Sequence, residues 1–249
     1  MNILIPHKWL QEHLDTSTEP KELQKLVSLS GPSVERIYER EGDSVYDVEI
    51  TTNRVDSMSI RGFAREAAVI LSQYDTNARL KKLTDDFEST TKQTTQETLP
   101  LPKINDNPTL NNRTMCVVLD GVERSATPDW MATRLGQTEM NVHDAAIDIT
   151  NYVTHELGHP CHAFDYDKIM AMGAEINIVE AEPEESFTTL DGTTYQTKGG
   201  EVVFKNGAGE IIDLPSIKGT KNTSVDDSTK RILLLAESIR SDKVRYASM

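Results

Sequence analysis

A polar stretch in the first half of the chain limits what its 249 residues can fold into. Residues 75–110 are rich in threonine, in charge and, towards the end, in proline, and they contain few large apolar side chains. Such a composition cannot build a hydrophobic core and is typical of a linker. We therefore expect two folded domains, residues 1–74 and residues 111–249, joined by this segment.

The first domain carries alternating helix and strand signals. The segment from Thr18 to Gly31 has a capping residue, an early proline, an apolar face and a terminal glycine, which predict a helix. Val45 to Ile50 alternate apolar and polar side chains, the pattern of a half-buried strand. Apolar residues then recur at helical spacing after a cap at Asp56 or Ser57. We expect a small helix-strand domain.

The second domain is dominated by strand signals. Asp191–Gly192 and Asn206–Gly207 each lie between two runs of strand-forming residues, which is a strong hairpin pattern. Met115–Leu119 and Ile232–Ala236 are apolar runs of strand length, and Asp129–Leu135 predicts a helix. We expect a larger mixed sheet with packed helices, so the fold class of the whole chain is α+β.

The overall charge and the cysteines exclude several classes of protein. A net charge of -14 argues against broad electrostatic capture of nucleic acid, so any contact with RNA must be local. Cys116 and Cys161 stand alone and cannot form a disulfide framework or a cysteine metal cage. No apolar stretch reaches membrane-spanning length and no leader pattern precedes Trp9, so we expect a cytoplasmic protein without a membrane partner.

One short motif suggests zinc chemistry. His155-Glu156-Leu157-Gly158-His159 matches a signature in which two histidines on one helix hold zinc and the glutamate activates water. Pro160 disfavours helix at His159, and the β-branched residues of Ile149–Thr154 favour a strand. We therefore expect a bent strand and loop from Thr150 to Ile169 and no metal site, and a zinc hydrolase remains the least favoured alternative.

The residues around this motif carry a longer resemblance. The runs Asp148–Val153, Glu156–Gly158 and Pro160–Ile169 resemble the editing-domain signature of β subunits of bacterial phenylalanyl-tRNA synthetase. Further matching segments follow the family's order: Trp9–Leu10, Ser30–Gly31, Val34–Glu35, Thr52–Asp56, Gly62–Glu66, Trp130–Met131, Thr189–Gly192, Gly219 and Val225–Asp226. The resemblance implies an amino-terminal fragment of such a subunit. It lacks the oligonucleotide-binding domain that many members insert after Val34–Glu35, and the carboxy-terminal modules.

The resemblance implies a proofreading function. An apolar pocket rejects one added hydroxyl only about a hundredfold, so the family hydrolyses tyrosyl-tRNA made in error at a second site. The pocket positions of the family fall on Thr150, Asn151, Pro160, His162 and Gly219. For Thr150 and Asn151 a purely structural role is left open, as it is for His162.

The same resemblance implies partners and cofactors. No residue of this chain is expected to catalyse aminoacylation, which the partner α subunit performs with ATP and Mg in the holoenzyme. The expected partners are that α subunit, in an α2β2 assembly, and tRNA(Phe). The fragment itself is expected to hold no cofactor and no metal. A free-standing aminoacyl-tRNA editing or binding protein is the alternative.

The glutamate that recognises the tyrosine hydroxyl in the family is displaced in this chain. Counting from Thr229 without gaps places Leu235 at the recognition position, and Glu237 follows two residues later. Residues two apart share one face of a strand, about 6 to 7 Å from each other. We therefore expect weakened hydrolysis of tyrosyl-tRNA.

Overall fold

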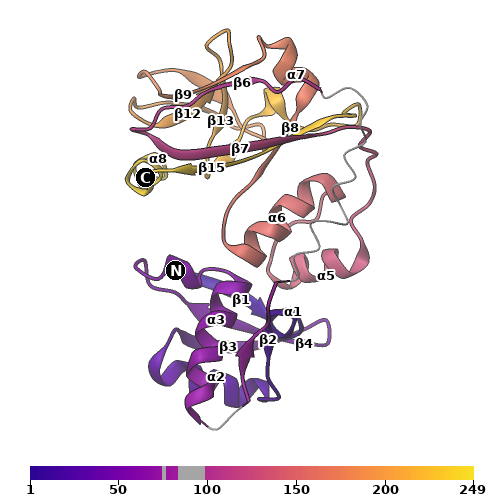
Figure 1. The fold of residues 1–249 in the computed structure, drawn as a ribbon, viewed down its shortest axis with the longest axis vertical. Helices are drawn as coiled ribbons and strands as arrows, with labels where there is room; N and C mark the ends of the chain where they lie inside the picture. Colours follow the sequence, from indigo (N-terminus) through magenta and orange to yellow (C-terminus); the bar gives the residue numbers. More distant parts are fainter. Residues whose placement is uncertain (75–76, 84–98) are drawn as a thin grey trace. The chain divides into compact units, whose positions relative to one another are not determined.

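The computed structural model describes residues 1–74, 77–83 and 99–249 (Figure 1). The chain divides into two compact units. The first comprises Met1–Thr94 and Ala126–His159, and the second comprises Thr95–Ser125 and Pro160–Met249. The first unit thus includes residues 126–159, which we had expected in the second domain.

The amino-terminal part of the first unit is a three-stranded antiparallel sheet packed against helices, in the strand order β1-β4-β3. The helix expected from Thr18 to Gly31 and the strand expected from Val45 to Ile50 are both present. The core includes the fully buried Trp9, Tyr46 and Phe63. The elements are β1 (Asn2–Pro6), α1 (His7–His13), β2 (Leu14–Asp15), α2 (Pro20–Ser30), β3 (Ser33–Arg40), β4 (Asp43–Glu49), α3 (Ile60–Leu71), β5 (Arg79–Leu80) and short 3-10 turns at Val55–Ser57 and Ser72–Tyr74.

Two further helices, α5 (Asp129–Gln137) and α6 (Ala145–Leu157), belong to this unit because their side chains share its core. The ring of Trp9 on α1 stacks on that of Tyr152 on α6, with centroids 4.3 Å apart. Arg134 on α5 lies over both rings and forms an ion pair with Glu12. Cation-π contacts of this kind are worth about 0.5–2 kcal/mol each.

The expected strand at Ile149–Thr154 is wrong, because these residues lie within α6. Two terminal signals favour the helix. Asp144 caps its start by accepting a hydrogen bond from the Ala146 amide, and Gly158 ends it in a left-handed conformation. The Thr154 hydroxyl donates to the Thr150 carbonyl oxygen, so the polar group of this β-branched residue has a hydrogen-bond partner inside the helix. Tertiary packing and caps outweigh the weak intrinsic propensity.

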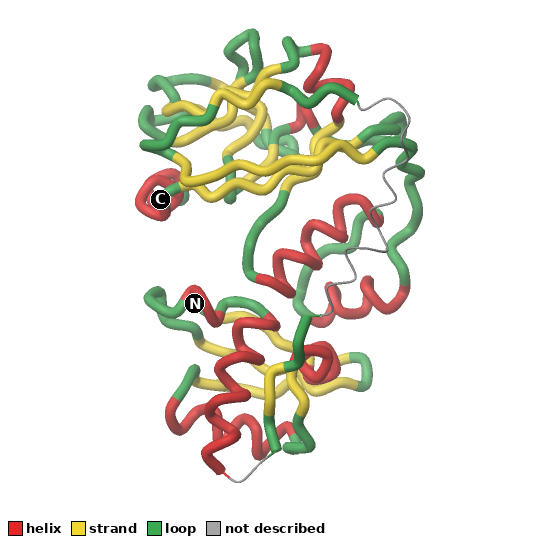
Figure 2. The backbone as a smooth tube through the Cα atoms, viewed as in Figure 1, coloured by secondary structure: helices red, strands yellow, loops and turns green. Residues whose placement is uncertain are grey.

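The second unit consists mainly of two sheets (Figure 2). Its main apolar core contains side chains from both sheets, and a smaller apolar cluster includes Val203 and Ile211. A five-stranded sheet has the order β14-β13-β12-β9-β6, a three-stranded sheet has the order β7-β15-β8, and β10 and β11 form a separate hairpin. The elements are β6 (Lys103–Asn105), β7 (Asn111–Leu119), β8 (His162–Asp165), α7 (Tyr166–Ala171), β9 (Glu175–Glu180), β10 (Ser186–Thr188), β11 (Thr194–Gln196), β12 (Val202–Lys205), β13 (Ile211–Leu214), β14 (Lys218–Gly219), a 3-10 turn at Lys221–Thr223, β15 (Ile232–Ile239) and α8 (Ser241–Ala247).

Both expected hairpins are present in the second unit. Phe187 pairs with Tyr195 across the turn at Asp191–Gly192, and Phe204 pairs with Asp213 across the turn that contains Asn206–Gly207. The predicted α+β class is confirmed, with a mixed sheet because β6 runs parallel to β9 and the other paired strands are antiparallel.

Part of the expected linker, residues 75–76 and 84–98, lies outside the described residues. The described remainder contains strands at both ends. Arg79–Leu80 pairs with β2, Lys103–Asn105 forms an edge strand of the five-stranded sheet, and Leu110 is buried. Within the described residues, no helix combines the length and hydrophobicity that crossing a bilayer requires.

Candidate functional site: a buried histidine between two carboxylates

The zinc-like motif is not continuous on one helix. α6 ends at Leu157, Gly158 has φ 84°, and His159 lies beyond the helix. A Cβ on Gly158 would lie 3.0 Å from the Ser59 Cβ, so the helix end also needs glycine for space. Within the described residues, no group of three or more His, Cys, Asp or Glu side chains is arranged to hold a metal ion.

The glutamate of this motif has a structural partner. Its carboxylate oxygen Oε1 lies 3.0 Å from Nε2 of His13 on α1, and both side chains are largely buried. Burial works to raise the pKa of Glu156, but the hydrogen bond and charge of His13 outweigh it and lower this pKa. The neighbouring His155 has a pKa lowered by burial, which favours the neutral imidazole. Glu156 therefore ties α6 to α1 and is not free to activate water.

The seven residues predicted from the family motif are divided between the two units. Thr150 and Asn151 lie on α6 in the first unit, and the Thr150 hydroxyl donates to the Ile147 carbonyl oxygen. This hydrogen bond matches the structural alternative for Thr150, although within a helix instead of at the end of a strand. The other predicted residues lie in the second unit: Pro160, His162, Gly219, Leu235 and Glu237.

His162 begins β8, where it is paired in register with Leu235 of β15. Its side chain is 16% exposed and its ring stacks on Phe164 with centroids 6.0 Å apart. Nε2 lies 3.7 Å from Oε1 of Glu237, and Nδ1 lies 3.7 Å from Oδ1 of Asp213. The imidazole therefore lies between two carboxylates, and each carboxylate faces a different ring nitrogen.

Glu237 lies on the same face of β15 as Leu235. Leu235 is fully buried in the apolar core of the second unit, whereas the Glu237 carboxylate reaches His162 and accepts a hydrogen bond of 2.9 Å from the Ser216 hydroxyl. The gap-free count thus leads to a core residue. The acidic group of the cluster comes from the residue two positions later, which the sequence analysis had included as an alternative.

Sequence reasoning missed Asp213. This residue lies on β13 and is fully buried, and among the described residues neither of its carboxylate oxygens has a hydrogen-bond partner. Burial raises its pKa to about 7, with His162 acting in the opposite direction and Glu237 adding to the rise. The available signal was one charged residue within the apolar run Ile211–Leu214, because an acid is rarely buried without a role.

Two neighbours shape this cluster. Gly219 on β14 is paired with Asp213, and a Cβ there would lie 3.2 Å from Leu190 Cδ1 and 3.7 Å from Asp213 Oδ1. Cys161 precedes His162, and burial together with the Glu237 charge raises the pKa of its thiol. A protonated thiol is a poor nucleophile, so the cluster is better suited to activating a water molecule through His162.

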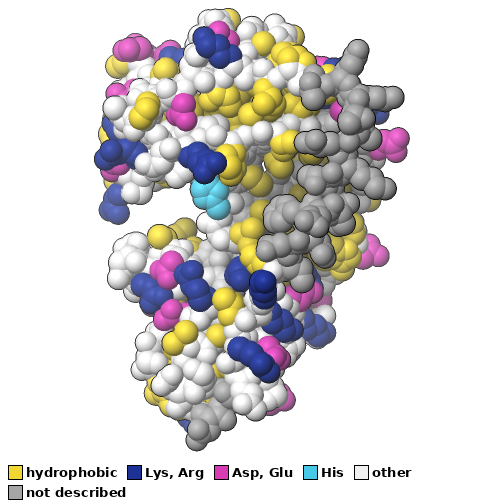
Figure 3. Space-filling view, viewed as in Figure 1, with side chains coloured by type: hydrophobic (Ala, Val, Ile, Leu, Met, Phe, Trp, Pro, Cys, Tyr) yellow, Lys and Arg dark blue, Asp and Glu magenta, His cyan; other side chains and the backbone are white. Residues whose placement is uncertain are grey.

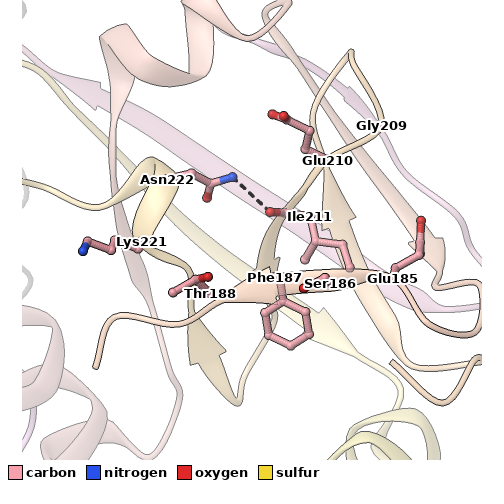
Figure 4. A pocket seen from close by; sticks show the side chains of 9 residues that line it. All are labelled: Glu185, Ser186, Phe187, Thr188, Gly209, Glu210, Ile211, Lys221 and Asn222. Atoms are coloured by element: carbon pink, nitrogen blue, oxygen red, sulfur yellow. Dashed lines mark hydrogen bonds between the residues drawn. The ribbon is translucent and has the colours of Figure 1, made fainter. Parts of the chain in front are cut away.

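A separate open pocket of about 600 Å³ occurs elsewhere in the second unit (Figure 4). One side of the pocket is formed by β10. At another side, the Asn222 side chain donates a hydrogen bond of 3.1 Å to the Ile211 carbonyl oxygen. None of the seven predicted site residues lines it. The lining residues are Glu185, Ser186, Phe187, Thr188, Gly209, Glu210, Ile211, Lys221 and Asn222.

Comparison with known proteins places these residues in a family. Residues 110–249, which include the His162 cluster, match the model of the B3/4 domain. The chain is 32% identical over 194 residues to the phenylalanine–tRNA ligase β subunit of Oleidesulfovibrio alaskensis, covering 77% of this chain and 23% of that subunit. It is 31% identical over 213 residues to the β subunit of Fusobacterium nucleatum, covering 86% of this chain and 25% of that one.

Among the solved structures that match is an N-terminal fragment of the phenylalanyl-tRNA synthetase β subunit from Pyrococcus horikoshii. The match has 15% identity and a TM-score of 0.46, and it covers 99% of this chain and 71% of the other. The chain spans about a quarter of the length of the curated relatives named above. The chain therefore belongs to the B3/4 domain family, in the form found in β subunits of phenylalanine–tRNA ligase.

Proposed function

We propose that this chain is the proofreading part of a phenylalanine–tRNA ligase β subunit, and that its second unit hydrolyses tyrosyl-tRNA made in error. The observation that carries this proposal is His162, a partly buried imidazole flanked by Asp213 and Glu237 within the region that matches the B3/4 domain. A histidine placed beside carboxylates can act as a general base towards water.

The reaction is the hydrolysis of an ester between the amino acid and the terminal ribose of tRNA. A water molecule beside Nε2 of His162 and the Glu237 carboxylate gives a proton to Nε2 as its oxygen bonds to the ester carbonyl carbon. The carbon–oxygen bond to the ribose then breaks, and the ribose oxygen takes the proton from Nε2. The products are free tyrosine and tRNA with an intact terminal hydroxyl group.

The burial of Leu235 supports a weakened activity towards tyrosine. An apolar side chain in the core of β15 cannot accept a hydrogen bond from a phenol hydroxyl. The resemblance, counted without gaps from Thr229, implies that the family's recognising glutamate stands at this position. Glu237 retains an acidic group in the cluster but shifts it along the strand. We therefore propose slower hydrolysis of tyrosyl-tRNA than in relatives with glutamate at this position.

We assign the remaining roles to partners. The α subunit of the ligase would bind ATP and Mg and activate phenylalanine, and tRNA(Phe) would be the shared substrate in an α2β2 enzyme. Lys and Arg side chains gather on the visible face of the first unit, which supports a local contact with RNA despite the net charge of -14 (Figure 3). Thr150, Asn151 and Pro160 stay predicted contributors to binding of the aminoacyl end.

A free-standing editing protein is less well supported. The similarity to the β subunits covers 77% and 86% of this chain in the two relatives described above, so it extends beyond the B3/4 match into the amino-terminal part. A protein that used only the hydrolytic domain would not need this part.

The test is single-turnover hydrolysis of preformed tyrosyl-tRNA and phenylalanyl-tRNA by the unmodified chain, by the same chain with its α subunit, and by a Leu235→Glu variant. We expect slow hydrolysis of tyrosyl-tRNA, little hydrolysis of phenylalanyl-tRNA, and a faster reaction in the variant if it folds. Hydrolysis at the rate without protein in every sample would refute the proposal.

A further inference from the structure

Asp213 is an unusual buried acid. The side chain is fully buried on β13, and neither carboxylate oxygen has a hydrogen-bond partner within the described residues. Burying an ionised carboxylate without partners costs on the order of several kcal/mol of desolvation free energy. A position of this kind calls for a specific role, and packing alone would favour an apolar residue.

The ring of His162 is a polar group on which Asp213 can act. Oδ1 of Asp213 lies 3.7 Å from Nδ1 of His162, on the side of the ring opposite to Glu237. We infer that Asp213 is a positioning residue for His162, and that its carboxylate holds the imidazole with the proton on Nδ1. Nε2 is then left as the basic nitrogen.

The chemistry of imidazole explains why this matters. A neutral imidazole carries one proton, and the hydrogen bond at one nitrogen decides which nitrogen is basic. An ionised carboxylate accepts a hydrogen bond and cannot donate one, so ionised Asp213 favours Nδ1–H in His162. Glu237 lies equally close to Nε2, but its Oε1 already accepts a hydrogen bond from the Ser216 hydroxyl, so it competes less for the imidazole proton. The separation of 3.7 Å is longer than a hydrogen bond, so in the free chain the Asp213 carboxylate acts on the Nδ1 proton by electrostatic attraction across the protein interior.

The surroundings leave Asp213 available for this contact. Gly219 stands opposite Asp213 on β14 and has no side chain to compete for the carboxylate. The other titratable groups are Glu237 from β15, which faces Nε2, and the Cys161 thiol, which burial and Glu237 keep protonated. Since burial raises the pKa of Asp213 to about 7, the ionised form that holds Nδ1–H gains population above neutral pH.

The tautomer of His162 can be measured without any substrate. Long-range proton–nitrogen correlation spectra of the histidine-labelled chain at pH 8 distinguish the two tautomers, and a His162→Gln variant assigns the signal. We expect mostly Nδ1–H in the unmodified chain and in an Asp242→Asn control, which changes an exposed acid on α8. In Asp213→Asn, whose amide can donate to Nδ1, we expect a shift towards Nε2–H.

Two results would overturn the inference. One is a majority of Nε2–H in the unmodified chain, which tests the pairing even if no Asp213 variant folds. The other is an unchanged tautomer in a folded Asp213→Asn variant. Both results concern the Asp213–His162 contact alone and are independent of hydrolysis.

The effect on hydrolysis rests on the function proposed above. Asp213→Asn should lower kcat for hydrolysis of tyrosyl-tRNA by at least about 100-fold, the usual contribution of a general base, and leave KM within about twofold. An unchanged kcat in the variant would remove Asp213 from the mechanism. If even the unmodified chain does not hydrolyse tyrosyl-tRNA, the proposed function fails, and the tautomer measurement still decides the pairing.

Discussion

Two histidine–carboxylate contacts in this chain differ in distance: one is a hydrogen bond, and the other is longer than a hydrogen bond. In the first unit, His13 and Glu156 approach to 3.0 Å, which is hydrogen-bond distance. In the second unit, His162 lies 3.7 Å from each of two carboxylates, and both oxygens of Asp213 lack hydrogen-bond partners in the part of the chain that the structure describes. The first contact satisfies its own groups, whereas the second leaves buried polar atoms without a hydrogen-bond partner among the described residues.

This difference shows how the motifs should be weighed. The zinc-like motif at residues 155–159 stands out in the sequence, yet its glutamate holds two helices together. The acid at Asp213 belongs to no motif, yet it lies beside the histidine of the candidate site. We therefore give a buried polar group without partners more weight in choosing a candidate site than a short pattern of metal ligands.

The largest expected effect is on the rate of hydrolysis, which should depend on His162 and not on His155 of the zinc-like motif. His162→Ala should reduce hydrolysis of tyrosyl-tRNA by about 100-fold to 10,000-fold because it removes the proposed general base. His155→Ala, seven residues earlier in the zinc-like motif, should stay within about twofold of the unmodified chain if the protein remains folded. Single-turnover rates measure both. Equal losses in the two variants would show that the comparison is wrong.

The second expected effect is on stability as a function of pH. The pKa of Asp213 is raised on folding from an ordinary value of 3.8 to about 7, so between these values the folded state retains a proton that the unfolded state has released. The free energy of unfolding therefore falls as pH rises through this window, and Asp213 lowers it by about 2–4 kcal/mol at pH 8.

Urea unfolding at pH 5 and pH 8 measures this effect. The loss of stability between the two pH values should be smaller in Asp213→Asn than in the unmodified chain. Asp242→Asn, which changes an exposed acid, should show the same loss as the unmodified chain. An identical loss in all three proteins would mean that Asp213 is already ionised at pH 5.

The third effect concerns the hydrogen bond between His13 and Glu156 in the first unit. Glu156→Ala should lower the free energy of unfolding by about 1.5–3 kcal/mol, because a largely buried hydrogen bond to His13 is lost. It should leave the tautomer of His162 unchanged. Chemical denaturation and the same nitrogen spectra report the two outcomes, and a change confined to the tautomer would reverse the assigned roles.

The smallest effect is on stability and concerns Gly158, which ends α6. Gly158→Ala should cost about 1–2 kcal/mol, because φ is 84° and a Cβ would lie 3.0 Å from Ser59. Gly136→Ala, at a glycine of α5 with nothing within 4 Å of a Cβ, serves as the control and should be neutral or stabilising. Thermal unfolding compares the two, and equal shifts would argue against strain at Gly158.

Local patterns predicted much of the fold. The turns at Asp191–Gly192 and Asn206–Gly207 and the alternation near Val45 are determined by neighbouring residues, so they were visible in the sequence. The helix at Ile149–Thr154 was not, because its stability depends on caps and on packing against distant helices. Propensity is a weak guide where tertiary contacts decide.

The candidate site was visible only in part. His162, Gly219 and Glu237 were indicated by resemblance to a family, and the structure brings them close to Asp213. Asp213 itself escaped notice because its significance depends on which strands are neighbours. Leu235 was named by counting along the strand, which cannot show that the acidic side chain two residues later reaches the histidine.

A structure of the chain bound to a non-hydrolysable analogue, 3′-tyrosylamido-adenosine, tests the central claim most directly. We predict that the amide carbonyl of the analogue lies beside Nε2 of His162, with Glu237 within hydrogen-bond reach of the position of the attacking water. Occupation of the open pocket at Phe187 and Lys221, with an empty region around His162, would contradict the account.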